Sequence, residues 1–401
     1  MTGKYSAGKR KHVGAPRRSL RRATVISCTI LFLAGGTALT LRVQSSRLHE
    51  ATYPTAEKRL RISTATASSV HLSYPITLPD GFAAPSGLVA VPSGVWFFDA
   101  SQNTRELFYW SSSSSSLVGY ELPPSDNDDP ALAVSSRTPM AIDAAGNIWI
   151  GINRAVLRFD PQTLSWSRTD LPADPLVASD VLSPPPFVGS SPYSFEVVDA
   201  LIAPSDGSIV VGRMFSSVLD VISSTGDVSA LPLPTGSVLP GDGPKDLAAL
   251  PGGEVGAVLY RAGVTVGSWQ LGLANSNGQW SDSTPCSEVT GVTSASGVVV
   301  AFGPNCIAWA TASASGGIGT FSVMQAAQNF GSVTNAIATG ESWVLADHSG
   351  GQLDALSSSS GQVATTSDQV SVETECMSTS GTEVWFTEEG AHPYIGAISV
   401  P

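Results

Sequence analysis

Short apolar runs bounded by glycine-containing turns recur through most of the chain. Residues 145–160 give the clearest example, AGNIWIGINRAVLRFD, and residues 381–399 repeat its outline as GTEVWFTEEGAHPYIGAIS. Runs rich in Val, Ile, Trp and Phe that stop at Gly, Asn or Asp are typical of β-strands joined by hairpin turns. A pattern that returns at intervals along one chain indicates a repeat architecture.

The turn-and-strand pattern can be aligned seven times along the chain. The residues at the centres of the aligned strands are Trp96, Trp149, Val210, Gly256, Val299, Trp343 and Trp385. Most copies have an apolar strand before the turn and further strands after it. Four short antiparallel strands in about 40–45 residues form one blade of a β-propeller. We therefore predict an all-β fold, a seven-bladed β-propeller over residues 69–401; two separate β-domains are the alternative.

One strand-like run lies before the first copy, and two insertions lie between copies. Residues 70–78, VHLSYPITL, precede the first copy, whereas the last copy ends one strand short at Pro401. We predict that residues 70–78 pair with the last blade and close the ring, because an open ring leaves sheet edges unpaired. The insertions, residues 111–129 and 172–192, are rich in Ser, Asp and Pro and are predicted surface loops.

The N-terminal part of the chain has a different pattern. Residues 1–22 are strongly basic, and residues 23–41, ATVISCTILFLAGGTALTL, are apolar and uncharged. A basic flank before an apolar run of this length predicts one transmembrane helix with a cytoplasmic N-terminus. A cleavable signal peptide is the alternative. Residues 42–68 are polar and aperiodic and are predicted to be a linker. The propeller would then be extracytoplasmic, on a single-pass anchor in the cell membrane, or secreted or periplasmic after cleavage.

Charge limits the classes of partner. The net charge is −12, but residues 1–22 hold eight of the 21 Lys and Arg residues and no acid, so the rest of the chain has a net charge of −20. An acidic domain repels nucleic acid and anionic lipid. We expect no nucleic-acid partner, and we expect contact with the membrane only through the N-terminal helix.

Three cysteines follow the apolar N-terminal segment. Cys286 and Cys306 are each predicted to begin a strand of the fifth blade, on the same face of the ring. A disulfide between them and two buried free thiols are both compatible with the sequence, because the spacing alone does not fix the distance between Cα atoms. The state of Cys376 is left open.

Two motifs resemble a known family. The second blade reads A-I-D-x-x-G-N-I-W-I-G, then L-R-F-D-P-x-T, and the last reads W-F-T-E-E-G, then Y-I-G-A-I. Both are similar to the virginiamycin B lyase family of seven-bladed propellers, and more loosely to NHL-like and gluconolactonase-type propellers. The resemblance covers about residues 70–401. It implies an enzyme that opens a cyclic ester by elimination with a magnesium ion.

The family's catalytic motifs match this chain only in part. Glu388 corresponds to the glutamate of the family's W-F-x-E motif, whereas the region of its Glu-x-His motif, Val372–Cys376, contains no histidine. Elimination needs a general base at an acidic C–H. His348 or His392 would have to replace the missing histidine, so it is uncertain from the sequence whether the chain is an enzyme.

The candidate ligand-binding residues follow the second strand of each predicted blade or precede its first strand. In a propeller these strand ends meet on one face, around the mouth of the central channel. The candidates are Asp99, Arg213, Lys245, Arg261, Asp347, Glu389 and His392.

Three functions fit this set of residues. The mouth binds a small molecule, a glycan or a protein without catalysis, which we favour. Alternatively, Glu388 and Asp347 hold Mg²⁺ or Ca²⁺, since carboxylates are hard ligands, and Glu388 and His348 serve a lyase or lactonase reaction. In the third reading the charges form a solvated rim and the domain is a scaffold for protein contacts. No cofactor is certain from the sequence.

Overall fold

The structure is a computed structural model in which two compact units, residues 1–55 and 56–401, are distinguished. All described residues belong to the second unit. They are 71–78, 85–99, 106–123, 138–152, 154–173, 197–214, 216–239, 246–261, 268–313, 317–325, 333–339, 343–348, 352–357, 363–369, 374–388 and 394–399. The predicted basic segment 1–22, anchor 23–41 and linker 42–68 lie outside these ranges. Within the ranges, no helix has the length and apolar character needed to cross a membrane.

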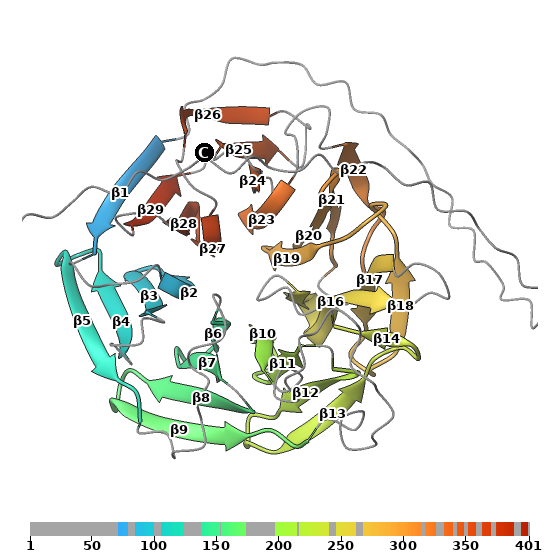
Figure 1. The fold of residues 1–401 in the computed structure, drawn as a ribbon, viewed down its shortest axis with the longest axis horizontal. Coiled ribbons are helices and arrows are strands. Elements are labelled where there is room, and N and C mark those ends of the chain that lie inside the picture. The colour runs from blue at the N-terminus through green and yellow to red at the C-terminus, as the bar shows by residue number, and fades with distance from the viewer. Residues whose placement is uncertain are drawn as a thin grey trace, which may run out of the picture. The chain divides into compact units, whose positions relative to one another are not determined.

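The described strands form antiparallel sheets that follow one another along the chain (Figure 1). Sheet 1 contains β2 (Pro85–Val91), β3 (Gly94–Asp99), β4 (Glu106–Ser111) and β5 (Ser116–Glu121). Sheet 2 contains β6 (Met140–Ile142), β7 (Ile148–Ile152), β8 (Ala155–Asp160) and β9 (Ser165–Asp170). Sheet 3 contains β10 (Val198–Ile202), β11 (Ile209–Arg213), β12 (Val218–Ile222) and β13 (Val228–Pro232).

The remaining sheets continue the series. Sheet 4 contains β14 (Ser237–Val238), β15 (Leu247–Leu250), β16 (Glu254–Arg261), β17 (Ser268–Ala274) and β18 (Trp280–Ser283), with a 3-10 turn at Pro251–Gly253. Sheet 5 contains β19 (Gly291–Ala295), β20 (Val298–Gly303), β21 (Cys306–Thr311) and β22 (Ser322–Gln325). Sheet 6 contains β23 (Val333–Thr339), β24 (Trp343–His348), β25 (Gln352–Ser357) and β26 (Val363–Gln369). Sheet 7 contains β27 (Thr374–Ser380), β28 (Glu383–Glu388), β29 (Tyr394–Ser399) and β1 (His71–Thr77).

The sheets surround a common centre, as in a β-propeller. The innermost strands are neighbours in the order β2, β6, β10, β15, β19, β23, β27, and β27 returns to β2 (Figure 1). Each residue that aligned the sequence copies, from Trp96 to Trp385, lies in the strand that is second from the centre of its sheet, which in sheet 4 is β16. The prediction of an all-β propeller is therefore confirmed, and the alternative of two separate β-domains is wrong.

The prediction of uniform four-stranded blades needs a correction. Six of the described sheets have four strands, but sheet 4 has five. Its inner edge is shared by two strands: β14 pairs with Tyr260 and Arg261, and β15 pairs with residues 254–257 of the same strand, β16. The inner strand is interrupted because residues 239–246, LPGDGPKD, are rich in Gly and Pro, which weaken or end strands.

The N-terminal strand closes the ring as predicted. β1 pairs with β29 in antiparallel register, with His71 opposite Ser399 and Leu72 opposite Ile398. Ile76 of β1 is buried in an apolar cluster that also contains residues of sheets 1 and 7. Burying a side chain of this size contributes about 1.5–3 kcal/mol. The junction between the last and first sheets is therefore a packed interface.

Contacts across that junction join β27 to β2. The backbone N–H of Ala90 donates to Ser378 Oγ at 2.9 Å, and the rings of Trp110 and Trp385 lie 5.5 Å apart. The other junctions are also apolar. Between sheets 1 and 2, the Phe159 ring lies 5.8 Å from Trp96 and 4.8 Å from Tyr120. Such aromatic pairs add about 0.5–1.5 kcal/mol each beyond the area that they bury.

One type of turn recurs in the hairpins that join the first strand of a sheet to the second, or the third strand to the fourth. These hairpins lie on one face of the ring. Gly146, Gly226 and Gly278 occupy the same position of three such turns, with φ values of 86°, 90° and 73°. Residues with a side chain rarely adopt these angles, which explains the glycine in each copy. The first residue of each turn, Asp143, Ser223 or Asn275, accepts a hydrogen bond through its side-chain oxygen. The donor is the backbone N–H of the residue four positions later. The turn chemistry thus produces the repeat seen in the sequence.

Candidate functional site

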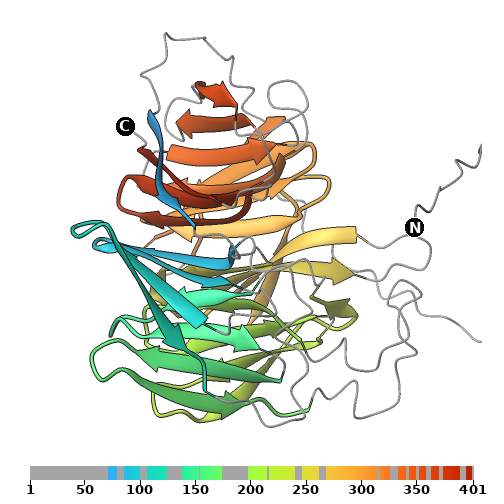
Figure 2. The same cartoon turned by 60° about the vertical axis from the view of Figure 1, so that its left-hand side comes forward.

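The opposite face of the ring gathers the strand ends on which the sequence placed the candidate site. Where the first strand of a sheet begins, the second strand ends: Pro85 pairs with Asp99 and Thr374 pairs with Glu388. Val198 pairs with Arg213 and Val333 with His348 in the same way. We call this side of the ring the crossover face, because the chain passes there from one sheet to the next. Figure 2 shows the short hairpin turns on the left, and β16 and β17 extend on the right beyond neighbouring strands.

The structure places five of the sequence-predicted residues at these strand ends. They are Asp99 of β3, Arg261 of β16, Asp347 and His348 of β24, and Glu388 of β28. Only the backbone positions of these five are described, so the roles of their side chains stay predictions. Lys245, Glu389 and His392 lie outside the described residues. The common face is therefore observed, and the contacts between the candidate side chains are not.

Arg213 is the candidate whose side chain is described, and it lies inside the domain. It is 1% exposed, and its Nε lies 2.9 Å from Asp220 Oδ2. Its Nη1 donates to the carbonyl oxygen of Pro172 at 2.8 Å. Pro172 begins the Pro-rich insertion after sheet 2. The sequence placed Arg213 at the channel mouth; the structure instead shows its charge engaged by a neighbouring strand and by the root of the insertion.

Sequence reasoning missed a group of buried carboxylates. Asp199, Asp220, Asp246 and Asp354 are at most 4% exposed. Asp199, Asp220 and Asp354 each interrupt a short apolar segment, as Asp220 does in VLDVI, and Asp246 directly precedes the apolar run LAAL. A charged residue inside an apolar run is the signal that could have identified them, because buried charges are normally paired.

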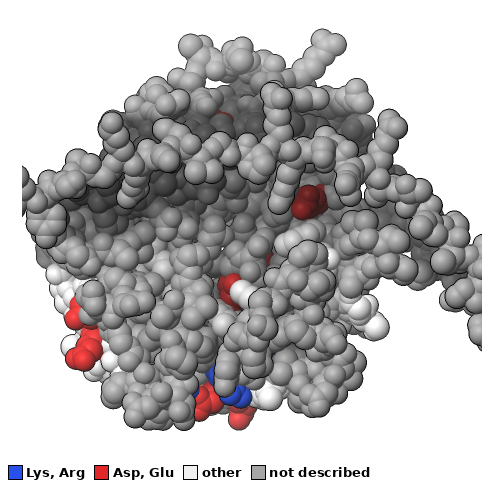
Figure 3. Space-filling view, in the orientation of Figure 1, with Lys and Arg blue, Asp and Glu red and all other residues white. Residues whose placement is uncertain are grey.

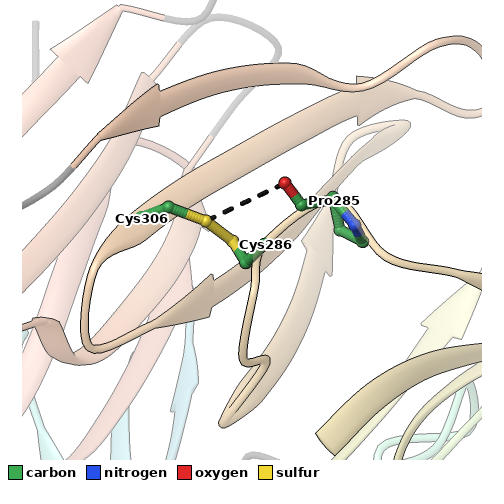
Figure 4. The surroundings of a disulfide bond; sticks show 3 residues. All are labelled: Pro285, Cys286 and Cys306. Carbon is green, nitrogen blue, oxygen red and sulfur yellow. Dashed lines mark hydrogen bonds between the residues drawn. A yellow bond between two sulfur atoms is a disulfide. The ribbon is translucent and has the colours of Figure 1, made fainter. Parts of the chain in front are cut away.

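A disulfide joins Cys286 and Cys306 at the crossover face of sheet 5 (Figure 4). Cys286 lies in the connection between β18 and β19, and Cys306 begins β21. Their Cα atoms are 5.9 Å apart, close to the commonest separation for disulfides. The carbonyl oxygen of Pro285 lies 4.0 Å from Cys306 Sγ. Of the two alternatives that the sequence left open, the structure contains the bridge, which fixes the entry into sheet 5.

Cys376 is buried and is not part of a disulfide. Its Sγ donates to the carbonyl oxygen of Ser86 at 3.3 Å, and its backbone N–H donates to Thr387 Oγ1 at 3.1 Å. The thiol thus contributes to the junction between sheets 7 and 1.

Described charges are sparse on the side of the molecule seen in Figure 3. Acidic side chains are visible at the lower rim and nearer the centre, whereas basic side chains are visible at the lower rim. Among the residues that the structure describes, no three His, Cys, Asp or Glu side chains are grouped so that they could hold a metal ion. The side chains of Glu388 and Asp347, the predicted metal ligands, lie outside the described part of the structure, and their role stays a prediction.

A cavity of about 340 Å³ lies at the centre of the ring. All seven innermost strands line it, from β2 to β27, mainly through residues in the middle of each strand. None of its described lining residues carries a charge. The cavity therefore differs chemically from the predicted charged mouth at the crossover face.

On the opposite face, the carboxylate of Asp143 has a structural role. Burial alone would raise the pKa of Asp143, but hydrogen bonds from the side chains of Trp149 and Asn147 and from two backbone N–H groups outweigh it and lower the pKa. Trp149 Nε1 donates to Asp143 Oδ2 at 2.9 Å. This carboxylate holds the turn that precedes β7 and has no feature of a catalytic acid.

No protein-family model and no curated protein matches this sequence. Solved structures do match. A catalytically inactive histidine-to-alanine variant of virginiamycin B lyase from Staphylococcus aureus, with quinupristin, aligns with a TM-score of 0.59 and 16% identity over 83% of this chain and 100% of the other. The chain shares its fold with virginiamycin B lyase.

Other structures support the same fold. A streptogramin B lyase aligns with a TM-score of 0.56 and 12% identity, over 83% of this chain and 98% of the other. YCF48 bound to D1 peptide aligns with a TM-score of 0.51 and 15% identity, over 85% of this chain and 100% of the other. At these identities the similarity to virginiamycin B lyase and to YCF48 shows the fold alone, because one propeller fold serves many unrelated functions.

Proposed function

We propose that this propeller binds a small molecule, a glycan or a protein partner at the crossover face, around the mouth of the central cavity. The observation that carries the proposal is the strand register. It brings the ends of β3, β16, β24 and β28 to one face, and these ends carry Asp99, Arg261, Asp347 and Glu388. Charges of both signs at one mouth favour a ligand with separated charges. Arg213 is not part of the proposed site, because its side chain is buried.

The proposed location is outside the cytoplasm. The Cys286–Cys306 disulfide supports it, since such bonds persist in oxidising compartments. Residues 23–41 would anchor the propeller in the cell membrane as a single span, or would direct its secretion if cleaved. The two solved relatives described with a peptide and with quinupristin support the general idea that this fold can present a binding face.

A thermal-shift screen with Mg²⁺, Ca²⁺, small dicarboxylates and oligosaccharides tests this proposal. We expect at least one of these probes to raise the melting temperature of the protein. Changing Lys245→Ala and Arg261→Ala together should abolish a shift caused by an anionic probe. Arg168→Ala is the matched control, because Arg168 is an exposed arginine on β9, the outermost strand of sheet 2. An anionic-probe shift that survives the double change, or that is lost equally in the control, would contradict the proposed site.

The second candidate function is a lyase or lactonase reaction on a cyclic ester, assisted by Mg²⁺. The similarity in fold to virginiamycin B lyase and the position of Glu388 in its W-F-x-E motif favour it. In this proposal Glu388 and Asp347 would hold the metal, which would supply Lewis-acid assistance at the ester carbonyl, and His348 would accept the proton from the carbon next to the bond that is eliminated. β24 and β28, which carry these residues, belong to adjacent sheets of the ring.

Ring opening of a cyclic depsipeptide, followed by mass spectrometry with and without Mg²⁺, tests the enzymatic proposal. Glu388→Gln should reduce turnover by at least a hundredfold. Glu383→Gln should leave turnover unchanged, because Glu383 is exposed at the other end of the same strand. Full turnover in the Glu388→Gln variant, or no turnover in the unmodified protein, would remove this candidate.

A further inference from the structure

The central cavity is large enough to hold a ligand. Its volume of about 340 Å³ falls at the lower end of the range of about 300–1,000 Å³ that is typical of small-molecule sites. The same space would hold about ten water molecules, at about 30 Å³ each. Size therefore permits a compact molecule, and the chemistry of the lining decides which kind.

The cavity offers hydrogen bonds but no charge. Its polar lining consists of hydroxyl groups and one carboxamide, that of Asn335, and no described lining residue is ionisable apart from the thiol of Cys376. Some hydroxyls already bind the protein: Ser294 donates to the carbonyl oxygen of Ala249, and Ser378 accepts from Ala90. A charged ligand would lose its hydration here without gaining an opposite charge, which costs several kcal/mol.

The polar groups that remain for a ligand lie on two adjacent inner strands. Asn335 of β23 uses Oδ1 to accept from the backbone N–H of Ala336 at 2.9 Å, which leaves its amide hydrogens oriented as donors. Thr293 of β19 contributes a hydroxyl to the same cavity. On the next inner strands, Met377 of β27 and Leu88 of β2 supply apolar surface. This combination suits a carbonyl or hydroxyl group attached to a small apolar body.

We infer that the central cavity is a binding site for a small uncharged molecule that carries an amide, an ester carbonyl or a hydroxyl group. The site is distinct from the charged crossover-face site proposed above. The two can be tested separately, because the cavity needs neither Lys245 nor Arg261.

Cys376 provides a reporter, since this residue lines the cavity and is not part of a disulfide. The full chain carrying Cys28→Ser would be treated with methyl methanethiosulfonate, which is uncharged, or with its sulfonatoethyl analogue, which is anionic. Mass spectrometry measures the rate at which Cys376 is modified. We expect the uncharged reagent to react at least tenfold faster. Cyclohexanecarboxamide should slow its reaction at least threefold, whereas cyclohexanecarboxylate, of the same shape but charged, should not.

Two variants test whether the residues that line the cavity are responsible for the protection of Cys376. Asn335→Asp should abolish protection by the amide because it places a charge in the cavity, and Thr293→Val, which keeps the shape, should weaken it. Asn275→Asp, on an exposed turn of sheet 4, should leave protection unchanged. Saturation-transfer NMR of cyclohexanecarboxamide is the second readout, and a signal is expected only with the amide. Equal rates with both reagents, or no protection and no NMR signal with the amide, would show that the cavity holds only water.

Discussion

Arg213 and Asp220 form an ion pair inside sheet 3, with Nε and Oδ2 2.9 Å apart and both side chains 1% exposed. The pair also fixes the carbonyl of Pro172, where the chain leaves sheet 2 for its Pro-rich insertion. The position of Arg213 at a strand end does not reveal such a pair, because the carboxylate lies on the neighbouring strand. Arg213, which was predicted to contact a ligand, therefore takes part in a buried structural interaction.

Arg213→Met should destabilise the propeller by about 3–5 kcal/mol, because it leaves a buried carboxylate without its cation. Replacing both partners, with Arg213→Met and Asp220→Leu, should cost less than the single change, because no buried charge then remains. Urea unfolding measures both effects. The control is Arg168→Met, which breaks an exposed pair with Asp170 and should cost at most about 1 kcal/mol. An effect of Arg213→Met no larger than that of the control would contradict the buried pair.

Asp143 should make stability depend on pH in the acidic range. Its pKa in the folded protein is lowered below the ordinary value of 3.8, so its carboxylate stabilises the fold above that value. The contribution is lost as the pH falls through the folded-state pKa. Asp143→Asn should therefore lower the melting temperature at pH 6, and the difference from the unmodified protein should shrink below pH 3.8. A difference that stays constant across this range would show that the charge of Asp143 is not responsible.

The Cys286–Cys306 disulfide should contribute about 3 kcal/mol, from the loop-closure entropy of a segment with a sequence separation of 20. Cys286→Ala with Cys306→Ala should lower the unfolding free energy by about that amount. Dithiothreitol should destabilise the unmodified protein to a similar degree and should leave the double variant unchanged. If dithiothreitol has no effect on the unmodified protein, the bridge is absent in solution.

The sequence was sufficient for the repeat and for the closure of the ring. Every aligned anchor, including the weak anchor Gly256, lies in the strand second from the centre of its sheet, because the turn chemistry and the apolar alternation are local properties of each blade. The extra strand of sheet 4 was not predicted. Ser237–Val238 is too short to read as a strand and is separated from Leu247–Leu250 by Gly and Pro, so only the pairing partner β16 reveals it.

The site was harder to predict than the fold. The shared face of Asp99 and Glu388 follows from strand direction, which repeats from blade to blade. Burial of Arg213 does not follow, because it depends on Asp220 and on Pro172, which lie 7 residues later and 41 residues earlier in the chain. The central cavity left no signal, because ordinary small residues from separate sheets line it.

Closure of the ring by β1 is the claim on which the common face and the central cavity depend. Two adjacent cross-strand pairs, His71 with Ser399 and Leu72 with Ile398, can each be replaced by cysteines in a background carrying Cys28→Ser and Cys376→Ala. Neighbouring antiparallel pairs alternate between wide and close spacing, so one of the two pairs should be close enough to form a disulfide. The pair His71→Cys with Ile398→Cys is the control, because a slip of one residue places the side chains on opposite faces.

The most direct measurement is disulfide formation in these three variants, by mass spectrometry of peptides produced without reduction. The account predicts a 71–399 or a 72–398 cross-link that forms in air and raises the melting temperature, and no cross-link in the control. Free thiols in both register pairs, or a cross-link only in the slipped control, would show that the first strand does not close the ring.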